Sequence, residues 1–254
     1  MRQIFWQVTL CTCMAAAAVL SGQAQPVDPN QEARKYRDFG VRQIEIGNYL
    51  SAIEALNKAV QSGPEDAVSR YHLGTAYYFN QQYDQALVHL QRALDLDAQY
   101  ASAYNRIGLV YSRIQQYEKA VSAFREAIRL TPGNAGAFYN LGCTYIRLKN
   151  FKNAVQSLVR SLALQPDNAE ALTSLGYAYA QQKRYREALG PVHKAVGLNP
   201  ELVEAQTLLG VLYLLTNNRS GAIRQYEIVK RLDVDSAAIL YDQMNRERIL
   251  RAYK

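Results

Sequence analysis

Apolar and small residues recur along this chain at a fixed spacing of 34 residues, the step from Ala33 to Ala67 and again to Ala101. Within each repeat unit the apolar positions are three, four or seven residues apart, which is the spacing of one face of a helix. Each unit is therefore predicted to form two amphipathic helices. Six units follow one another without insertion or deletion, at residues 33–66, 67–100, 101–134, 135–168, 169–202 and 203–236.

Two positions of every unit carry a small residue where its two helices should touch. Position 8 is glycine in all six units, beginning with Gly40, and position 20 is alanine in all six, beginning with Ala52. The missing bulk lets two helices approach closely, while larger residues at positions 7, 11 and 24 fill the space around them. Four units end in a proline, which should stop the second helix: Pro64, Pro132, Pro166 and Pro200.

This pattern resembles the tetratricopeptide repeat family over residues 33–236. The resemblance implies an all-α fold, a right-handed α-solenoid of six helical hairpins, whose concave face is lined by the first helix of each hairpin. One departure is Gly190-Pro191 inside the second helix of the fifth unit. Proline lacks a backbone N–H and its ring presses on the preceding turn, so this helix should bend or start late.

The resemblance also directs attention to the helix face that the core does not use. With positions 4, 7, 8 and 11 buried, positions 2, 5, 9, 12 and 13 form the opposite stripe, which faces the groove in the family. Aromatic side chains beside arginine are typical of binding hot spots. Tyr71 and Tyr139 could instead help adjacent hairpins pack. The candidate groove residues are Tyr71, Tyr78, Phe79, Asn105, Leu109, Arg113, Tyr139, Ile146, Arg147 and Tyr177.

Positive charge is concentrated in the middle of a chain whose formal net charge is +7. No acidic residue occurs between Glu126 and Asp167. This stretch is either an ordinary solvated face or a patch that attracts an acidic partner. Arg113 and Arg147 both occupy position 13 of successive units, so we expect their guanidinium groups to lie near one another and to act together on an acidic group of a partner.

The sequence offers no recognisable catalytic or metal-binding set. Its three histidines, His72, His89 and His193, are not at metal-ligand spacing from another histidine or a cysteine. No P-loop, GxSxG or HExxH motif is present. The clamp with which some family members bind a C-terminal carboxylate is also missing, because Val41, His72 and Ser102 occupy three of its positions. We therefore expect a non-enzymatic scaffold that needs no cofactor or metal and binds protein or peptide.

The first residues are predicted to be an export signal, residues 1–24, rather than part of the fold. Arg2 provides a positive start, residues 4–20 are largely apolar, and Gly22 and Ala24 are small residues at the positions that a signal peptidase inspects. Cleavage after Ala24 would leave a periplasmic or secreted protein without an integral membrane span, and export argues against nucleic acid as the partner. An uncleaved anchor and a cytosolic location are the alternatives.

The two ends of the repeat array are assigned from the same patterns. Residues 25–32 are predicted to be a short linker, and residues 237–254 a capping helix with Leu240 and Met244 on its apolar side. A solenoid's last repeat leaves an apolar face open, and such a helix would cover it. The leading function is a scaffold that holds a peptide or helical segment of a partner in its concave groove. The alternative is a pilotin-like envelope, pilus or secretion assembly factor that docks through its convex or terminal face.

Overall fold

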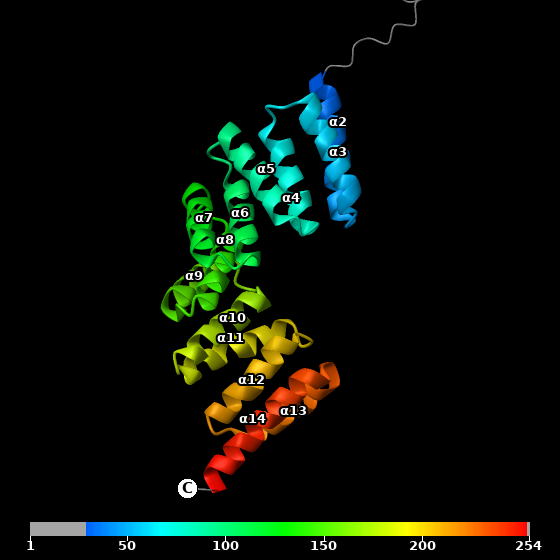
Figure 1. Cartoon of the computed structure of the whole chain (residues 1–254). Coiled ribbons are helices and arrows are strands. Elements are labelled where there is room, and N and C mark those ends of the chain that lie inside the picture. Colours follow the sequence, from blue (N-terminus) through cyan, green and yellow to red (C-terminus); the bar gives the residue numbers. More distant parts are fainter. Residues whose placement is uncertain (1–28, 253–254) are drawn as a thin grey trace, which may run out of the picture.

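A computed structural model describes residues 29–252, which form thirteen helices and no strand (Figure 1). The predicted signal peptide lies outside the described residues. The helices form six antiparallel hairpins and a terminal helix, which confirms the all-α repeat solenoid. The hairpins are α2 (Pro29–Glu45) with α3 (Tyr49–Ser62), α4 (Ala67–Phe79) with α5 (Tyr83–Leu96), α6 (Ala101–Arg113) with α7 (Tyr117–Leu130), α8 (Ala135–Arg147) with α9 (Phe151–Leu164), α10 (Ala169–Gln181) with α11 (Tyr185–Leu198), and α12 (Val203–Leu215) with α13 (Arg219–Leu232), followed by α14 (Val234–Ala252).

The middle hairpins share one orientation along the solenoid. In Figure 1 the first helices α4, α6 and α8 lie on the inner side of the curved molecule, and their partners α5, α7 and α9 lie on the outer side. Each turn inside a hairpin contains one residue with a positive φ, such as Gly47 (φ 78°) and Lys149 (φ 56°). The repeated turn keeps the hairpins alike, so equivalent positions of the repeat meet the same neighbours.

The small residues at position 8 allow the two helices of a hairpin to touch, as the sequence predicts. A Cβ atom added to Gly108 would lie 2.6 Å from the ring of Phe124, which is completely buried. The last repeat differs, because the nearest side chain to a Cβ on Gly210 is Leu240 of α14 at 2.6 Å, while Gln225 of α13 lies farther away at 3.5 Å. The terminal helix therefore supplies the side chain that position 24 supplies in the other repeats.

Three helix boundaries differ from the sequence prediction. The helix α2 starts at Pro29, inside the predicted linker, since proline suits the first turn of a helix, where its missing N–H costs nothing. The helix α11 does not start late, and it has the same 14 residues as α9 despite Pro191. Gly190, next to Pro191, is exposed, and a Cβ added to it would meet no other part of the described structure within 4 Å, so this turn of α11 faces solvent.

The terminal helix α14 begins at Val234, three residues before the predicted start. Asp233 explains the early start, because its Oδ2 atom accepts a hydrogen bond from the backbone N–H of Ser236 at 2.9 Å and caps the helix. Ala237 and Leu240 are buried against α12 and α13, as expected of a capping helix. No helix within residues 29–252 is long and apolar enough to cross a membrane.

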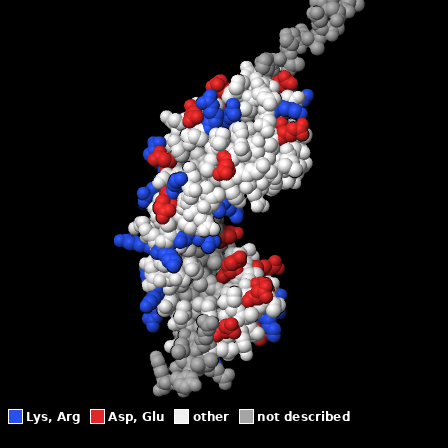
Figure 2. Space-filling view, in the orientation of Figure 1, with Lys and Arg blue, Asp and Glu red and all other residues white. Residues whose placement is uncertain are grey.

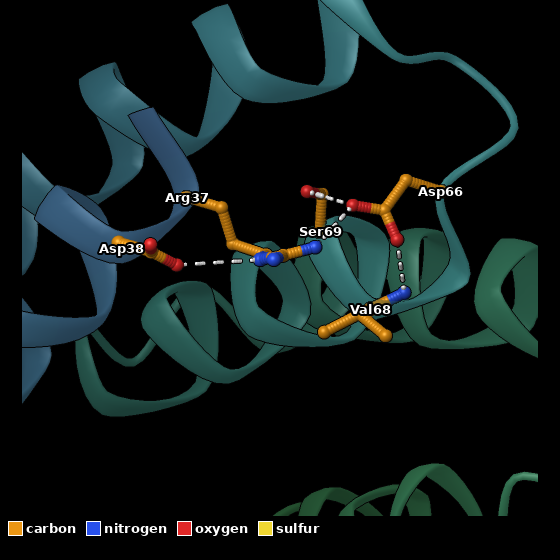
Figure 3. Close-up of polar contacts among 5 residues, drawn as sticks. All are labelled: Arg37, Asp38, Asp66, Val68 and Ser69. Carbon is orange, nitrogen blue, oxygen red and sulfur yellow. Dashed lines mark hydrogen bonds and ion pairs between the residues drawn. The ribbon is translucent and has the colours of Figure 1, made fainter. Parts of the chain in front are cut away.

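Asp66 links the first hairpin to the second (Figure 3). Its Oδ1 atom accepts a hydrogen bond from the backbone N–H of Val68 at 3.0 Å, which caps α4, and Oδ2 accepts from Ser69 Oγ at 2.6 Å and Arg37 Nη1 at 2.9 Å. Burial alone would raise the pKa of Asp66, but the hydrogen bonds and the Arg37 charge outweigh it and hold the pKa below its ordinary value. A charged carboxylate therefore joins two repeats.

Candidate partner-binding groove

A pocket of about 350 Å³ opens on three successive first helices, α8, α10 and α12. Its position on these helices is the one that the groove prediction requires. Three predicted groove residues, Ile146, Arg147 and Tyr177, meet here. The full lining is Cys143, Ile146 and Arg147 from α8, Thr173, Ser174 and Tyr177 from α10, and Glu204 and Leu208 from α12.

A second pocket, of about 590 Å³, continues the first towards the end of the solenoid. The two share Tyr177, Glu204 and Leu208, and the second reaches α14 through Ser236 and Gln243. Together they form one depression across α8, α10, α12 and α14, which we call the C-terminal groove. The capping helix therefore also forms a wall of the candidate site.

The C-terminal groove combines apolar surface with two separate charges. Tyr177 is 40% exposed, and Ile146 and Leu208 are partly buried beside it. Arg147 and Glu204 are exposed, and neither forms an ion pair with any side chain that the structure describes. An apolar side chain of a bound segment can pack in the pocket while its neighbours meet the charges, which is how hot spots at protein interfaces are built.

Cys143 does not provide a reactive nucleophile in this pocket. Burial raises the pKa of its thiol, so the uncharged form dominates at neutral pH. The Sγ atom lies 3.9 Å from Ser174 Oγ. Tyr139 is half-buried next to it, and burial, followed by the contact with Cys143, raises the pKa of its phenol. Cys143, Ser174 and Tyr139 therefore form a packed, weakly hydrogen-bonded part of the groove wall.

Tyr78 is not an exposed groove anchor, contrary to the prediction. Its side chain is only 8% exposed and belongs to the core between the second and third hairpins. Position 12 lies at the edge of the stripe, where a long tyrosine reaches the next hairpin. Its neighbour Phe79 remains 39% exposed and stacks on Tyr49 with 5.4 Å between ring centroids. Tyr71 packs on the same core, with its ring 5.0 Å from that of Tyr100.

Three other predicted groove residues contribute to contacts between repeats. Asn105 Oδ1 accepts a hydrogen bond from Asn140 Nδ2 at 3.3 Å, which joins α6 to α8. Leu109 packs against the cores on both sides of it, and Tyr139 packs against the core around Phe124. These contacts favour the packing interpretation that the sequence left open for Tyr71 and Tyr139.

Arg113 and Arg147 have different surroundings, although they occupy equivalent positions. Arg113 Nε donates a hydrogen bond to the hydroxyl of Tyr78 at 3.2 Å, which directs the side chain back towards the preceding repeat. Arg147 lines the pocket on α8, α10 and α12 together with Glu204, and Arg113 does not. The two arginines thus have different contacts, and their joint action on one acidic group of a partner stays a prediction.

Five residues of the pocket are not among the ten candidates: Cys143, which lies on the predicted stripe at position 9, and Thr173, Ser174, Glu204 and Leu208. Thr173 and Glu204 occupy positions 5 and 2 of the predicted stripe, so the stripe itself contained the signal. Ser174 and Leu208 occupy position 6, which the stripe did not include. Position 6 is four residues from position 2 and three from position 9, and it therefore lies on the same helix face.

Comparison with known proteins identifies the family to which this repeat architecture belongs. Two models of the family described as tetratricopeptide repeat match the chain, one at residues 65–133 and the other at residues 37–87 and 139–202, so together they match more than half of it. No curated protein matches. The matched ranges include the glycine at position 8 and the alanine at position 20 of the first five repeats.

Several solved structures resemble the chain. YrrB, described as a TPR protein with an unusual peptide-binding site, is 27% identical with a TM-score of 0.64, over 75% of this chain and 99% of YrrB. PilF of Pseudomonas aeruginosa is 21% identical with a TM-score of 0.77, over 86% of this chain and 99% of PilF. MamA of Desulfovibrio magneticus RS-1 is 22% identical with a TM-score of 0.61, over 67% of this chain and 97% of the MamA chain. The last two likenesses concern the fold alone. The chain belongs to the tetratricopeptide repeat family.

Proposed function

We propose that this protein is a non-enzymatic scaffold that binds a segment of another protein in its C-terminal groove. The observation that carries the proposal is the pocket on α8, α10 and α12, where Arg147 and Glu204, which form no ion pair with another described residue, lie beside the apolar surface of Tyr177. Proteins with this repeat are generally protein-interaction scaffolds. The similarity to YrrB, a relative described as having a peptide-binding site, supports the use of the groove.

The groove suits an extended or helical segment better than a small molecule. The two pockets run across the four helices α8, α10, α12 and α14, so a ligand that fills them must be long. The exposed Arg147 lies at the α8 end of the run, and the exposed Lys183, in the turn between α10 and α11, lines the second pocket. A bound segment would place its apolar anchor over Tyr177 and Leu208 and its polar residues towards the rims.

Substitution of one groove residue against a matched residue outside the groove tests the proposal. Tyr177→Ala removes an aromatic side chain that is 40% exposed and should weaken capture of the partner by about 2 kcal/mol. Val159→Ala, on α9, removes an apolar side chain that is 45% exposed and should leave capture unchanged. The measurement is the affinity for a partner isolated from an envelope extract with the wild-type protein. Equal affinities for both variants and the wild type would reject the groove.

We also propose that the protein acts after export, in the periplasm or outside the cell, with residues 1–24 removed. The support is the sequence pattern of a charged start, an apolar run and small residues at positions 22 and 24. Mass spectrometry of the protein purified from its native cells should give a chain that begins at Gln25. A soluble cytosolic protein that begins at Met1 would reject both the cleavage and the location.

A second candidate function is an envelope or secretion assembly factor that docks through the terminal face. It is favoured by exposed apolar side chains on α14, where Ile239 is 58% exposed and Tyr241 is 51% exposed. Ile239→Glu with Tyr241→Ala should abolish partner capture if this face is used. The groove proposal predicts that this double variant binds normally while Tyr177→Ala does not.

A further inference from the structure

A single buried tyrosine, Tyr78 on α4, positions two arginines of the next repeat. Arg113 Nε donates a hydrogen bond to the Tyr78 hydroxyl at 3.2 Å. The guanidinium carbon of Arg106 lies 5.2 Å from the centroid of the Tyr78 ring and 5.2 Å from that of Phe79, which is the geometry of a cation–π contact. Because Tyr78 is only 8% exposed and packed in the core, its orientation is fixed.

The two arginines come from the same face of α6. They are seven residues apart, or about 10.5 Å along the helix at 1.5 Å per residue, and side chains at this spacing point in similar directions. Both point towards the α4 side, because both contact Tyr78. The arrangement is specific to this pair of repeats, since position 12 is tyrosine in the second repeat alone.

Neither arginine has an acidic partner among the side chains that the structure describes. Within residues 29–252, Arg106 and Arg113 form no ion pair, and the buried Nε atom of Arg106 has no hydrogen-bond acceptor among the described side chains and backbone. Asp66 is already engaged by Arg37, Ser69 and the end of α4. Two positive groups on one tyrosine repel each other, and an incoming carboxylate would relieve this repulsion.

We propose that Arg106 and Arg113, held on Tyr78, form a binding site for an acidic stretch of a partner protein. Two guanidinium groups held on one tyrosine can each pair with a carboxylate of an acidic peptide. The exposed ring of Phe79, 39% accessible and stacked on Tyr49, provides apolar surface for the residue between the carboxylates. This inference rests on the proposed function, and it places an acidic part of the bound segment at the α4–α6 end of the inner face.

The contacts with Tyr78 also reduce the conformational entropy that the two arginine side chains lose when a ligand binds. An arginine stacked on an aromatic ring keeps the N–H groups at its edge free for bidentate contact with a carboxylate. Long side chains usually lose conformational freedom when they bind, but the tyrosine already restricts both arginines. Figure 2 shows Lys and Arg gathered across the middle of the molecule, and residues 127–166, which follow the site along the solenoid, contain no acidic residue.

Two fluorescent peptides test the site: one with aspartates on both sides of a leucine, and the same peptide with asparagines. The wild-type protein should bind the aspartate peptide more tightly. The double variant Arg106→Gln, Arg113→Gln should weaken that binding by at least about tenfold, as expected for lost charge-assisted hydrogen bonds. The control variant Arg160→Gln removes an exposed, unpaired arginine on α9 and should change binding by less than about twofold.

Tyr78→Phe separates a positioning role from a structural one. It keeps the ring under Arg106 and the core packing but removes the hydroxyl that holds Arg113, so affinity should fall several-fold at an unchanged melting temperature. In an Arg113→Gln background the same substitution should have no further effect, because the bond is already absent. A full additional loss in that background would overturn the positioning role.

The outcomes distinguish this site from the C-terminal groove. The proposed occupant would be overturned if the wild-type protein bound the aspartate and asparagine peptides equally, or if the double arginine variant bound the aspartate peptide as tightly as the wild type. Tighter binding of a phosphopeptide than of the aspartate peptide would also overturn it. If Tyr177→Ala weakens capture of the natural partner and the arginine variants do not, the site is wrong and the groove proposal stands. If the arginine variants weaken capture and Tyr177→Ala does not, the site stands and the groove proposal fails.

Discussion

Leu240 of α14 closes the end of the solenoid, and its replacement by alanine should destabilise the last repeat. The side chain is completely buried and fills the space over Gly210 that position 24 fills in the other repeats. The residue one position earlier provides a matched control, because Ile239 on the same helix is 58% exposed. Ile239→Ala removes a similar amount of hydrocarbon from water-facing surface, so its effect should be small.

The magnitude follows from what the substitution removes. Leu240→Ala deletes three buried carbon atoms, worth about 2.4 kcal/mol at about 0.8 kcal/mol for each buried methylene. The cavity left between α12, α13 and α14 raises the cost to roughly 3 to 5 kcal/mol if the helices do not close on it. For Ile239→Ala we expect less than about 0.5 kcal/mol, as for other exposed surface positions.

Urea unfolding followed by circular dichroism measures the difference, and hydrogen exchange locates it. In a solenoid the loss can appear as local detachment of α14, so amides of α12 to α14 should lose protection before those of α4 to α9. Light scattering should then show self-association through the uncovered face. Equal destabilisation by Ile239→Ala and Leu240→Ala, or unchanged protection of α12 to α14, would refute the capping role.

Three further predictions concern single positions. Gly108→Ala places a Cβ 2.6 Å from Phe124 and should destabilise by about 1 to 2 kcal/mol in urea unfolding, whereas Gly197→Ala, with no atom within 4 Å, should not. Asp66→Asn should lower stability by about 1 kcal/mol at neutral pH; because folding depresses the pKa of Asp66, this difference should persist above about pH 4 and vanish as the pH falls through the folded pKa. Cys143→Ser should keep partner affinity within about threefold, since the raised pKa leaves an unreactive thiol. A constant stability difference for Asp66→Asn down to low pH, or binding lost with Cys143→Ser, would contradict these assignments.

Much of the fold could be predicted because the repeat forces the same residues into the same contacts. Gly108 meets Phe124 as positions 8 and 24 of one unit, and a single sequence shows this relation several times over. The exception at Gly210 could not be predicted from the period, because its neighbour Leu240 lies outside the repeats. Pro191 does not delay the start of α11, and a bend there stays a prediction, because the effect of a proline depends on whether solvent or a neighbouring helix faces its turn.

The candidate site was harder to predict, because helix periodicity assigns a residue to a face but not to a contact. Tyr78 lies on the predicted groove stripe, yet a side chain of that length reaches the next hairpin and becomes buried there. Arg113 donates a hydrogen bond to the Tyr78 hydroxyl and is therefore directed towards the preceding repeat, while the equivalent Arg147 faces a pocket. These differences arise from individual side chains in neighbouring repeats, which the repeat pattern averages out.

Site-specific photocrosslinking in cells tests the central claim most directly, because it reports which face touches a partner. A photoreactive phenylalanine analogue in place of Tyr177 in the C-terminal groove is compared with the same analogue in place of Val159 on the outer face, two positions of similar exposure, 40% and 45%. We expect the groove position to crosslink a specific protein and the outer position to give none. A specific crosslink from position 159 alone would contradict a partner-binding groove.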